Sequence, residues 1–285
     1  MADPSPADVG DFVRNNRYLL FAGMGFAGGA LGALAAEMVG GKKSATVIVM
    51  ALGVALWASV FSAFLCAGLF WAVSIYGRKP GVPWESLAKA AISGAIAGAL
   101  AGGVAQLVFS IPMESLELRQ LFLKPMCWGL AGGLIGWRLS KVIPNLGGRR
   151  GTLAGLVGGV VGGYGFIFSC ALLPELMGRM LGVGIMGAAL GLAIVVVELI
   201  FRKAVLEVEW GPKEVTSVSL GPQPVFIGGG DDHIHVGGLA QHTASITFKE
   251  GRIEYMDKAT GQQTALKSGS RIKIGKVEIR VKAES

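Results

Sequence analysis

The side chains best suited to metal binding or acid–base chemistry gather in one short stretch, at Asp231, Asp232, His233, His235 and His242. His233 and His235 alternate, so on a strand they would share a face, as metal ligands do. No cysteine or carboxylate pattern completes a metal site, and the preceding run of three glycines lacks the helix and the Gly-Lys-Ser/Thr sequence of a phosphate loop. We therefore predict loop acids and half-exposed strand histidines, with no metal, no cofactor and no catalytic residues.

Few polar side chains interrupt the apolar part of the chain. Gln106 is strongly polar and deep in an expected helix, where it is either a substrate or ion contact or an interhelical hydrogen bond, and we favour the hydrogen bond, which is worth about 0.6 kcal/mol. Glu37 and Glu198 fall near helix ends, and Glu198 stands four residues before Arg202, with which it can pair on one helix face. These features argue against a pump with ionisable groups in mid-membrane.

The composition points to a membrane protein with a small soluble tail. Of the 285 residues, 52% are hydrophobic and 16% are charged, whereas a soluble domain carries about 25% charged residues. Residues 1–203 have a net charge of +7, and residues 204–285 have a net charge of zero. The basic excess therefore lies beside apolar segments, which is typical of membrane-flanking charge and not of a nucleic-acid partner.

Six apolar runs are long enough to cross a hydrocarbon core of about 30 Å, which takes roughly 20 helical residues. They are Tyr18–Val39, Thr46–Tyr76, Ala90–Ile111, Leu121–Ile143, Thr152–Leu173 and Met180–Phe201. The fourth is the weakest, because Lys124 and Pro125 at one end and Arg138 at the other shorten its apolar centre. Eleven cations on the N-terminal side against five on the other predict that residues 1–17 face the cytoplasm, and six crossings then place the C-terminal tail there as well. We expect the membrane to be an inner or plasma membrane.

Glycine is the main packing signal in residues 18–203. In lipid, glycines spaced by four leave a groove through which helix backbones approach closely. The glycines that we expect at helix contacts are Gly28, Gly32, Gly94, Gly98, Gly102, Gly129, Gly133, Gly155, Gly159, Gly163, Gly187 and Gly191. The predicted fold of this part is an all-α, six-helix transmembrane bundle packed as a glycine zipper, and such a bundle needs no pore.

The tail, residues 204–285, has the sequence pattern of strands and not of helices. Short β-branched segments of period two alternate with Gly-Pro, Gly-Gly-Gly, Glu-Gly and Ser-Gly turns, and no helix-length segment interrupts them. Eight or nine such strands in about 80 residues indicate a small all-β sandwich. Because the join at Phe201–Leu206 is short, we expect the sandwich to sit close against the membrane face.

Several tail segments resemble the forkhead-associated (FHA) domain over about residues 205–285. The resemblance is carried by Val225-Phe-Ile-Gly228, Ile234-His-Val236, Ala244-Ser-Ile246, Asp257–Thr264, Leu266-Lys-Ser-Gly-Ser-Arg-Ile-Lys-Ile-Gly275 and Val277-Glu-Ile-Arg-Val281. In the last part, Ser270 replaces the aspartate of the family's Gly-Asp turn. FHA domains read phosphothreonine through an Arg, a Ser and an Asn on loops at one end of the sandwich.

This chain departs from the family at those loop positions. They are occupied by Gly229, Ala240, Gln241, Thr243, Gln262 and Gln263. The Arg, Ser and Asn with which the family grips a phosphate are therefore missing from these positions, and Asp231 and Asp232 add negative charge nearby. We predict that these positions contact a protein partner without requiring phosphate. The alternative is a structural sandwich that caps the bundle or mediates self-assembly.

The predicted function is that of an adaptor, not an enzyme. We expect a membrane anchor whose FHA-like tail recruits a cytoplasmic protein partner, with the lipid bilayer as its second partner and a homo-oligomer as a further state. FHA resemblance implies a neighbourhood of Ser/Thr kinase signalling or secretion machinery. The alternatives are a small channel or transporter regulated by its tail, and a subunit of a larger membrane assembly.

Overall fold

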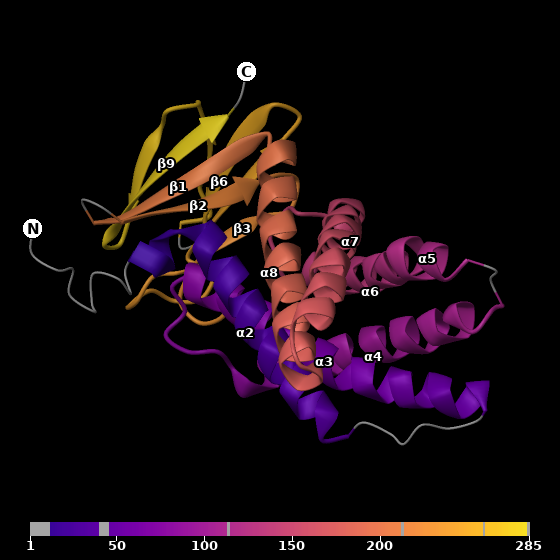
Figure 1. Ribbon diagram of the computed structural model, residues 1–285. Coiled ribbons are helices and arrows are strands. Elements are labelled where there is room, and N and C mark those ends of the chain that lie inside the picture. Colours follow the sequence, from indigo (N-terminus) through magenta and orange to yellow (C-terminus); the bar gives the residue numbers. More distant parts are fainter. Residues whose placement is uncertain (1–11, 40–45, 113–114, 212–213, 259, 284–285) are drawn as a thin grey trace, which may run out of the picture.

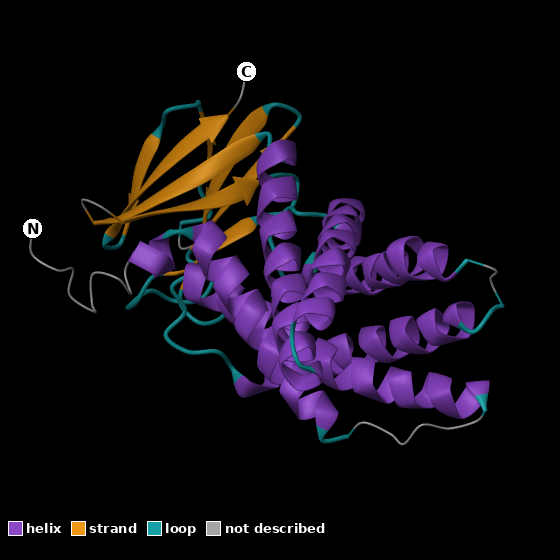
Figure 2. Ribbon diagram, viewed as in Figure 1, coloured by secondary structure: helices purple, strands orange, loops and turns teal. Residues whose placement is uncertain are grey.

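The computed structural model describes residues 12–39, 46–112, 115–211, 214–258 and 260–283. Helices come first and strands follow, which confirms the predicted order of a helical part and a C-terminal β part (Figures 1 and 2). The long helices are α2 (Arg17–Glu37), α3 (Val47–Tyr76), α4 (Trp84–Phe109), α6 (Lys124–Leu139), α7 (Gly148–Leu172) and α8 (Glu175–Phe201). Residues 1–11 of the predicted N-terminal segment lie outside the described residues.

Five of these helices, α2, α3, α4, α7 and α8, are long and apolar enough to cross a membrane. The fourth predicted crossing is shorter than expected, because α6 has 16 residues, or about 24 Å at 1.5 Å per residue. The short α5 (Leu116–Leu118) and the π-helical η1 (Arg119–Leu123) precede it. It ends before Ile143 because Pro144 has no N–H with which to continue the helix. The fourth crossing, and with it the total of six, therefore stays a prediction.

The helices pack in the order α4, α3, α2, α8, α7 and α6, and α6 touches α4 again. Their outer faces carry large apolar side chains, such as Ile48, Leu52 and Leu100, which are 70%, 65% and 60% exposed. A water-soluble protein rarely leaves so much apolar surface uncovered. Several exposed apolar helices of this kind are compatible with a membrane protein.

Glycines lie where these helices approach one another. A methyl group built on any of the twelve glycines expected at helix contacts would come within 3.0 Å of an atom of a neighbouring helix. On Gly98 it would come 2.6 Å from the Ser62 Cβ, and on Gly155 it would come 2.6 Å from the Gly132 carbonyl carbon. Gly132 and Gly136 of α6 approach the backbone of α7 equally closely. These two contacts were not predicted, although the two glycines are also spaced by four. Close backbone packing therefore holds the helical part together.

The C-terminal part consists of two sheets. Their strand orders are β2-β1-β9-β8 and β4-β3-β5-β6-β7. The strands are β1 (Ala204–Gly211), β2 (Glu214–Leu220), β3 (Val225–Gly228), β4 (Ile234–His235), β5 (Ala244–Lys249), β6 (Arg252–Asp257), β7 (Gln263–Leu266), β8 (Arg271–Ile274) and β9 (Val277–Ala283). Side chains from both sheets, including Leu206, Ile227, Ile246 and Ile279, form one buried core. The two sheets therefore pack face to face.

The β part is held against the helices along the edge strand β2. Only Arg202 and Lys203 separate α8 from β1, so the polypeptide passes directly from helix to sheet (Figure 1). The Tyr76 hydroxyl, at the end of α3, donates to the Ser217 carbonyl oxygen at 3.2 Å and accepts from the Ser217 N–H at 2.9 Å. A strand edge that would otherwise be open is thereby covered.

Candidate functional site

The six loop positions singled out in the sequence lie at one end of the sandwich. The loop before β5, which ends at Thr243, is adjacent to the loop between β6 and β7, because the Lys258 N–H donates to the Thr243 carbonyl oxygen at 3.1 Å. Within the second loop, the Asp257 N–H donates to the Gln262 carbonyl oxygen at 3.0 Å. The side chains of four of the positions are exposed. These four, which we name the loop surface, are Ala240, Gln241, Gln262 and Gln263. Thr243 is half-buried and Gly229 is buried.

Gly229 fits its place only because it has no side chain. Its N–H donates to the Ala240 carbonyl oxygen at 2.9 Å, and a Cβ on Gly229 would overlap the carbonyl oxygen of Leu239. An arginine here, as the FHA resemblance would require for phosphate binding, is excluded by the backbone of the facing loop.

A buried acid occupies the centre of the same loops. The Asp232 carboxylate is fully buried, accepts the His242 N–H at 2.7 Å and pairs with His242 Nδ1. The Phe226 ring stacks on the His242 ring at 4.3 Å and on the His233 ring at 5.8 Å. A negative charge in this position opposes binding of a phosphate dianion. Within the described ranges, no three His, Cys, Asp or Glu side chains converge as metal ligands would.

Part of this loop end is already occupied by the helical part. The His235 N–H donates to the Gly77 carbonyl oxygen at 3.1 Å, and Lys79 Nζ donates to the Asp231 carbonyl oxygen at 3.1 Å. A methyl group on Gly77 would lie 2.8 Å from the His233 carbonyl oxygen. Arg78 and Lys79 were predicted as membrane-flanking charge, being two of the eleven cations on the N-terminal side, and this contact was not predicted. The side chains of the loop surface stay exposed beside this contact.

Burial shifts the ionisation of two groups at this contact. It lowers the pKa of His233 below the ordinary value of 6.5, and the nearby charge of Lys79 adds to the effect, against a smaller opposing influence of Asp232. It also lowers the pKa of Lys79, against the opposing influence of Asp231 and Asp232. His233 Nδ1 accepts the Phe226 N–H at 3.0 Å, which requires that nitrogen to be unprotonated.

We expect acid to destabilise the loop end through His233. Because the folded protein holds a proton on His233 less readily than the unfolded chain, stability is complete above pH 6.5 and falls as the pH drops toward the lowered pKa. The loss is at most about 1.4 kcal/mol per pH unit. Thermal unfolding between about pH 7 and pH 5 measures it. His233→Gln should flatten the profile and His235→Gln should not, and an unchanged slope in His233→Gln would refute the assignment.

A buried ion pair links the helices to β2. The Arg17 guanidinium, at the start of α2, pairs with the Glu198 carboxylate near the end of α8, and one of these hydrogen bonds measures 2.8 Å. Ser219 Oγ of β2 donates to Glu198 Oε1 at 2.7 Å. The predicted pairing of Glu198 with Arg202 is wrong, because α8 ends at Phe201 and Arg202 takes an extended backbone, off the helix face.

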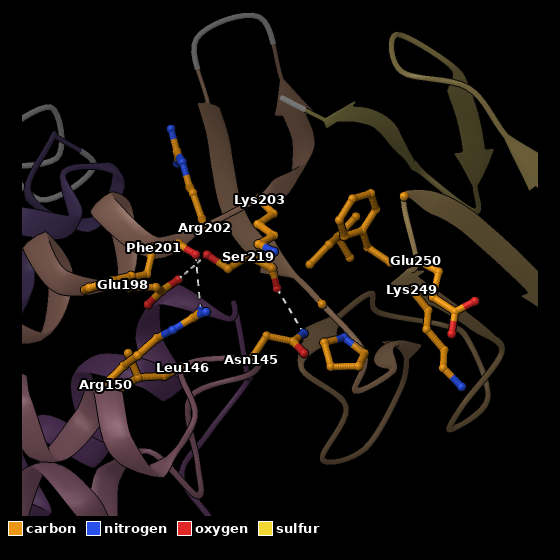
Figure 3. Close-up of a pocket in the computed structure, with 15 residues that line it drawn as sticks. Asn145, Leu146, Arg150, Glu198, Phe201, Arg202, Lys203, Ser219, Lys249 and Glu250 are labelled. Carbon is orange, nitrogen blue, oxygen red and sulfur yellow. Dashed lines mark hydrogen bonds between the residues drawn. The ribbon is translucent and has the colours of Figure 1, made fainter. Parts of the chain in front are cut away.

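Further polar contacts fasten both ends of β2. Asn145 Nδ2 donates to the Ser219 and Gln223 carbonyl oxygens at 3.2 and 3.1 Å. Near the other end, an Arg78 nitrogen donates to a Glu214 carboxylate oxygen at 3.1 Å. Two cavities, of about 430 and 500 Å³, are both lined by Glu198 and Ser219. Figure 3 shows the first of them. The sandwich is thus fixed to the helices by hydrogen bonds that involve charged groups.

The third hollow is a groove of about 1190 Å³ among α3, α4, α6 and α7. Its lining is mostly apolar and includes Trp57, Phe61 and Trp128, which form part of an aromatic cluster. Gln106 also lines it, but its Nε2 donates to Ser110 Oγ of the same helix at 3.3 Å. In the described part of the chain, the interhelical bond that we favoured for Gln106 is not formed.

No family model, curated protein or solved structure matches the chain.

Proposed function

We propose that this protein is an integral membrane adaptor. Six crossings place both termini in the cytoplasm, and a degenerate FHA-like domain presents the loop surface to a protein partner. The observation that carries the proposal is a patch of exposed loop side chains on a sandwich whose neighbouring loop is bonded to the helical part at Asp231 and His235. A surface held in one place relative to the membrane suits recruitment, because little freedom is lost when a partner binds.

The loop surface suits a peptide or protein without phosphate. Gln241 and Gln262 offer neutral amide donors and acceptors, which match backbone groups of a partner. Phosphate recognition needs cationic donors converging on one point, whereas the buried Asp232 carboxylate lies behind these loops. The proposed contact therefore does not depend on phosphothreonine.

In this proposal the helical part serves as anchor. Polar side chains that would line a conducting path bond within their own helices, as Ser93 does to the Ala90 carbonyl oxygen and Ser169 to the Gly165 carbonyl oxygen. The groove lined by Gln106 shares no lining residue with the two cavities beside β2. Neither feature supports the channel or transporter alternative.

A second candidate, a subunit of a larger membrane assembly, draws on the same groove. Gly53 lies in it, and a methyl group on Gly53 would meet nothing within 4 Å. An open glycine on an apolar helix face suits close approach by another helix. This role is compatible with the adaptor role, because an adaptor can be fixed to such an assembly through its helices.

The test is capture of the partner by the intact protein and by a loop-surface variant, Gln241→Ala with Gln262→Ala. Since truncating two central contact residues removes more than about 1 kcal/mol each, recovery of the partner should fall on the order of tenfold or more. The measurement is quantitative co-purification from solubilised membranes, with phosphatase-treated and untreated samples side by side.

The matched control is Lys267→Ala with Lys273→Ala, two exposed residues outside the loop surface. Recovery with this control should equal that of the unmodified protein, and phosphatase should change neither. Equal losses in both variants, or loss after phosphatase treatment, would contradict the proposal.

A further inference from the structure

The cavity of about 430 Å³ beside β2 is lined by an excess of cations. It opens where α8 ends, where α7 begins and where the β part meets them (Figure 3). The charged residues of its lining are Arg150, Arg202, Lys203, Lys249, Glu198 and Glu250. One of the two acids, Glu198, is already neutralised by Arg17.

The four cations are not balanced within the molecule. Among the ion pairs of the described residues, none involves Arg150, Arg202, Lys203 or Lys249. Uncompensated like charges around one hollow repel one another and favour an anion that relieves the repulsion. The charge distribution therefore indicates an anionic ligand.

Two of the cations are placed to hold such a ligand. An Arg150 nitrogen donates to the Phe201 carbonyl oxygen at 3.2 Å, and its guanidinium carbon lies 5.2 Å from the centre of the Phe201 ring. This fixes one edge of the guanidinium, and its remaining N–H groups are available to a ligand. Figure 3 shows Arg150 and Lys203 extending toward Ser219 from different elements, whereas Arg202 extends away.

The position of the cavity suggests where the anion comes from. Arg150 is in the first turn of α7 and Phe201 is the last residue of α8, and both helices are long and apolar enough to span a membrane. The ends of spanning helices lie at the depth of lipid headgroups. A guanidinium and an ammonium group there suit the phosphate of an anionic lipid.

We propose that this cavity binds a phosphate group, gripped by Arg150 and Lys203, with Arg202 and Lys249 adding to the positive field. A lipid headgroup and free phosphate present the same chemistry to these side chains. A phosphate bound here touches α7, the join after α8 and the β part at once. It therefore strengthens the docking of the β part on the helices.

The experiment uses the full chain in detergent and native mass spectrometry, with phosphatidylglycerol and phosphatidylcholine as lipid probes and inorganic phosphate as a separate probe. Phosphatidylglycerol should bind more tightly than phosphatidylcholine. Because each cation near a lipid headgroup contributes about 1 kcal/mol, Arg150→Gln with Lys203→Gln should weaken binding on the order of 10- to 30-fold. Lys276→Gln, an exposed cation at the other end of the sandwich, is the control and should leave binding unchanged.

Each outcome of this experiment either supports or overturns the proposed phosphate site. Preferential lipid binding that inorganic phosphate does not displace assigns the site to a headgroup, and binding of inorganic phosphate without lipid preference assigns it to free phosphate. If the first variant fails to fold, Lys203→Gln with Lys249→Gln replaces two exposed side chains and should shift binding in the same direction. Unchanged binding of both probes in the folded cavity variants, or an equal loss in Lys276→Gln, overturns it.

Discussion

Replacing Gly155 by leucine is expected to prevent stable packing of α6 against α7. A side chain at Gly155 meets the backbone of Gly132 and not the flexible end of another side chain, so it cannot be accommodated by a change of rotamer. The helices must move apart, which also breaks the approaches of Gly136 and Gly159. Overpacking of this kind costs about 3 kcal/mol or more. The expected result is a drop of about 10 °C in the thermal midpoint, or loss of monodisperse protein in detergent.

Gly23→Leu is the matched control for this substitution. Gly23 is also a glycine within an apolar helix, α2, but it is exposed and a methyl group there meets nothing within 4 Å. Leucine favours helix over glycine, so this variant should be as stable as the unmodified protein or slightly more so. Gly155→Ala should fall between the two. Equal thermal midpoints for Gly155→Leu and Gly23→Leu would show that α6 and α7 do not approach as described.

Glu198→Ala is expected to loosen the attachment of the β part to the helices. The substitution leaves the mostly buried Arg17 guanidinium without its carboxylate and Ser219 without its acceptor. Removing one partner of a buried ion pair costs about 3–5 kcal/mol, because the remaining charge stays desolvated. The join at Arg202 and Lys203 should become cleavable by trypsin, and backbone amides of β2 should exchange hydrogen faster.

The control removes an exposed ion pair instead. Lys282 pairs with Glu207 at 2.6 Å on the surface of the sandwich, and Glu207→Ala should cost no more than about 1 kcal/mol. A double-mutant cycle with Arg17→Ala then isolates the buried pair, since the two substitutions together should cost less than the sum of the single ones. Additive losses would show that Arg17 and Glu198 do not interact in the folded protein.

Much of the architecture could be predicted because its signals are local. A long apolar run specifies a helix in lipid wherever it packs, and alternation of period two specifies a strand. For that reason α2, α3, α4, α7 and α8 were expected near their observed bounds, and the nine strands of the described residues agree with the eight or nine expected. The exception is α6, a helix of 16 residues that directly follows the π-helical η1 and ends at Leu139, four residues before the expected bound at Ile143.

The candidate site was only partly predictable. The positions of Gln241 and Gln262 on adjacent loops followed from the FHA resemblance, and the structure places those loops side by side. The resemblance did not reveal that Gly77 and Lys79 occupy the neighbouring loop, because they belong to a helix end more than a hundred residues away. Three cations of the cavity beside β2, Arg150, Arg202 and Lys203, were predicted as membrane-flanking charge, but their clustering with Lys249 was not predicted.

By itself, the sequence determined an apolar helical part followed by a β part, with glycines spaced for close contact between helices. Tertiary structure alone decided that Glu198 pairs with Arg17 and not with Arg202, and that β2 lies along the helix ends. It also decided that Arg150 and Lys203 line the same cavity. The physical reason is the range of the interactions. Hydropathy and backbone period act between near neighbours in the chain, whereas a buried charge takes the partner that folding brings within a few ångströms, whatever its distance in sequence.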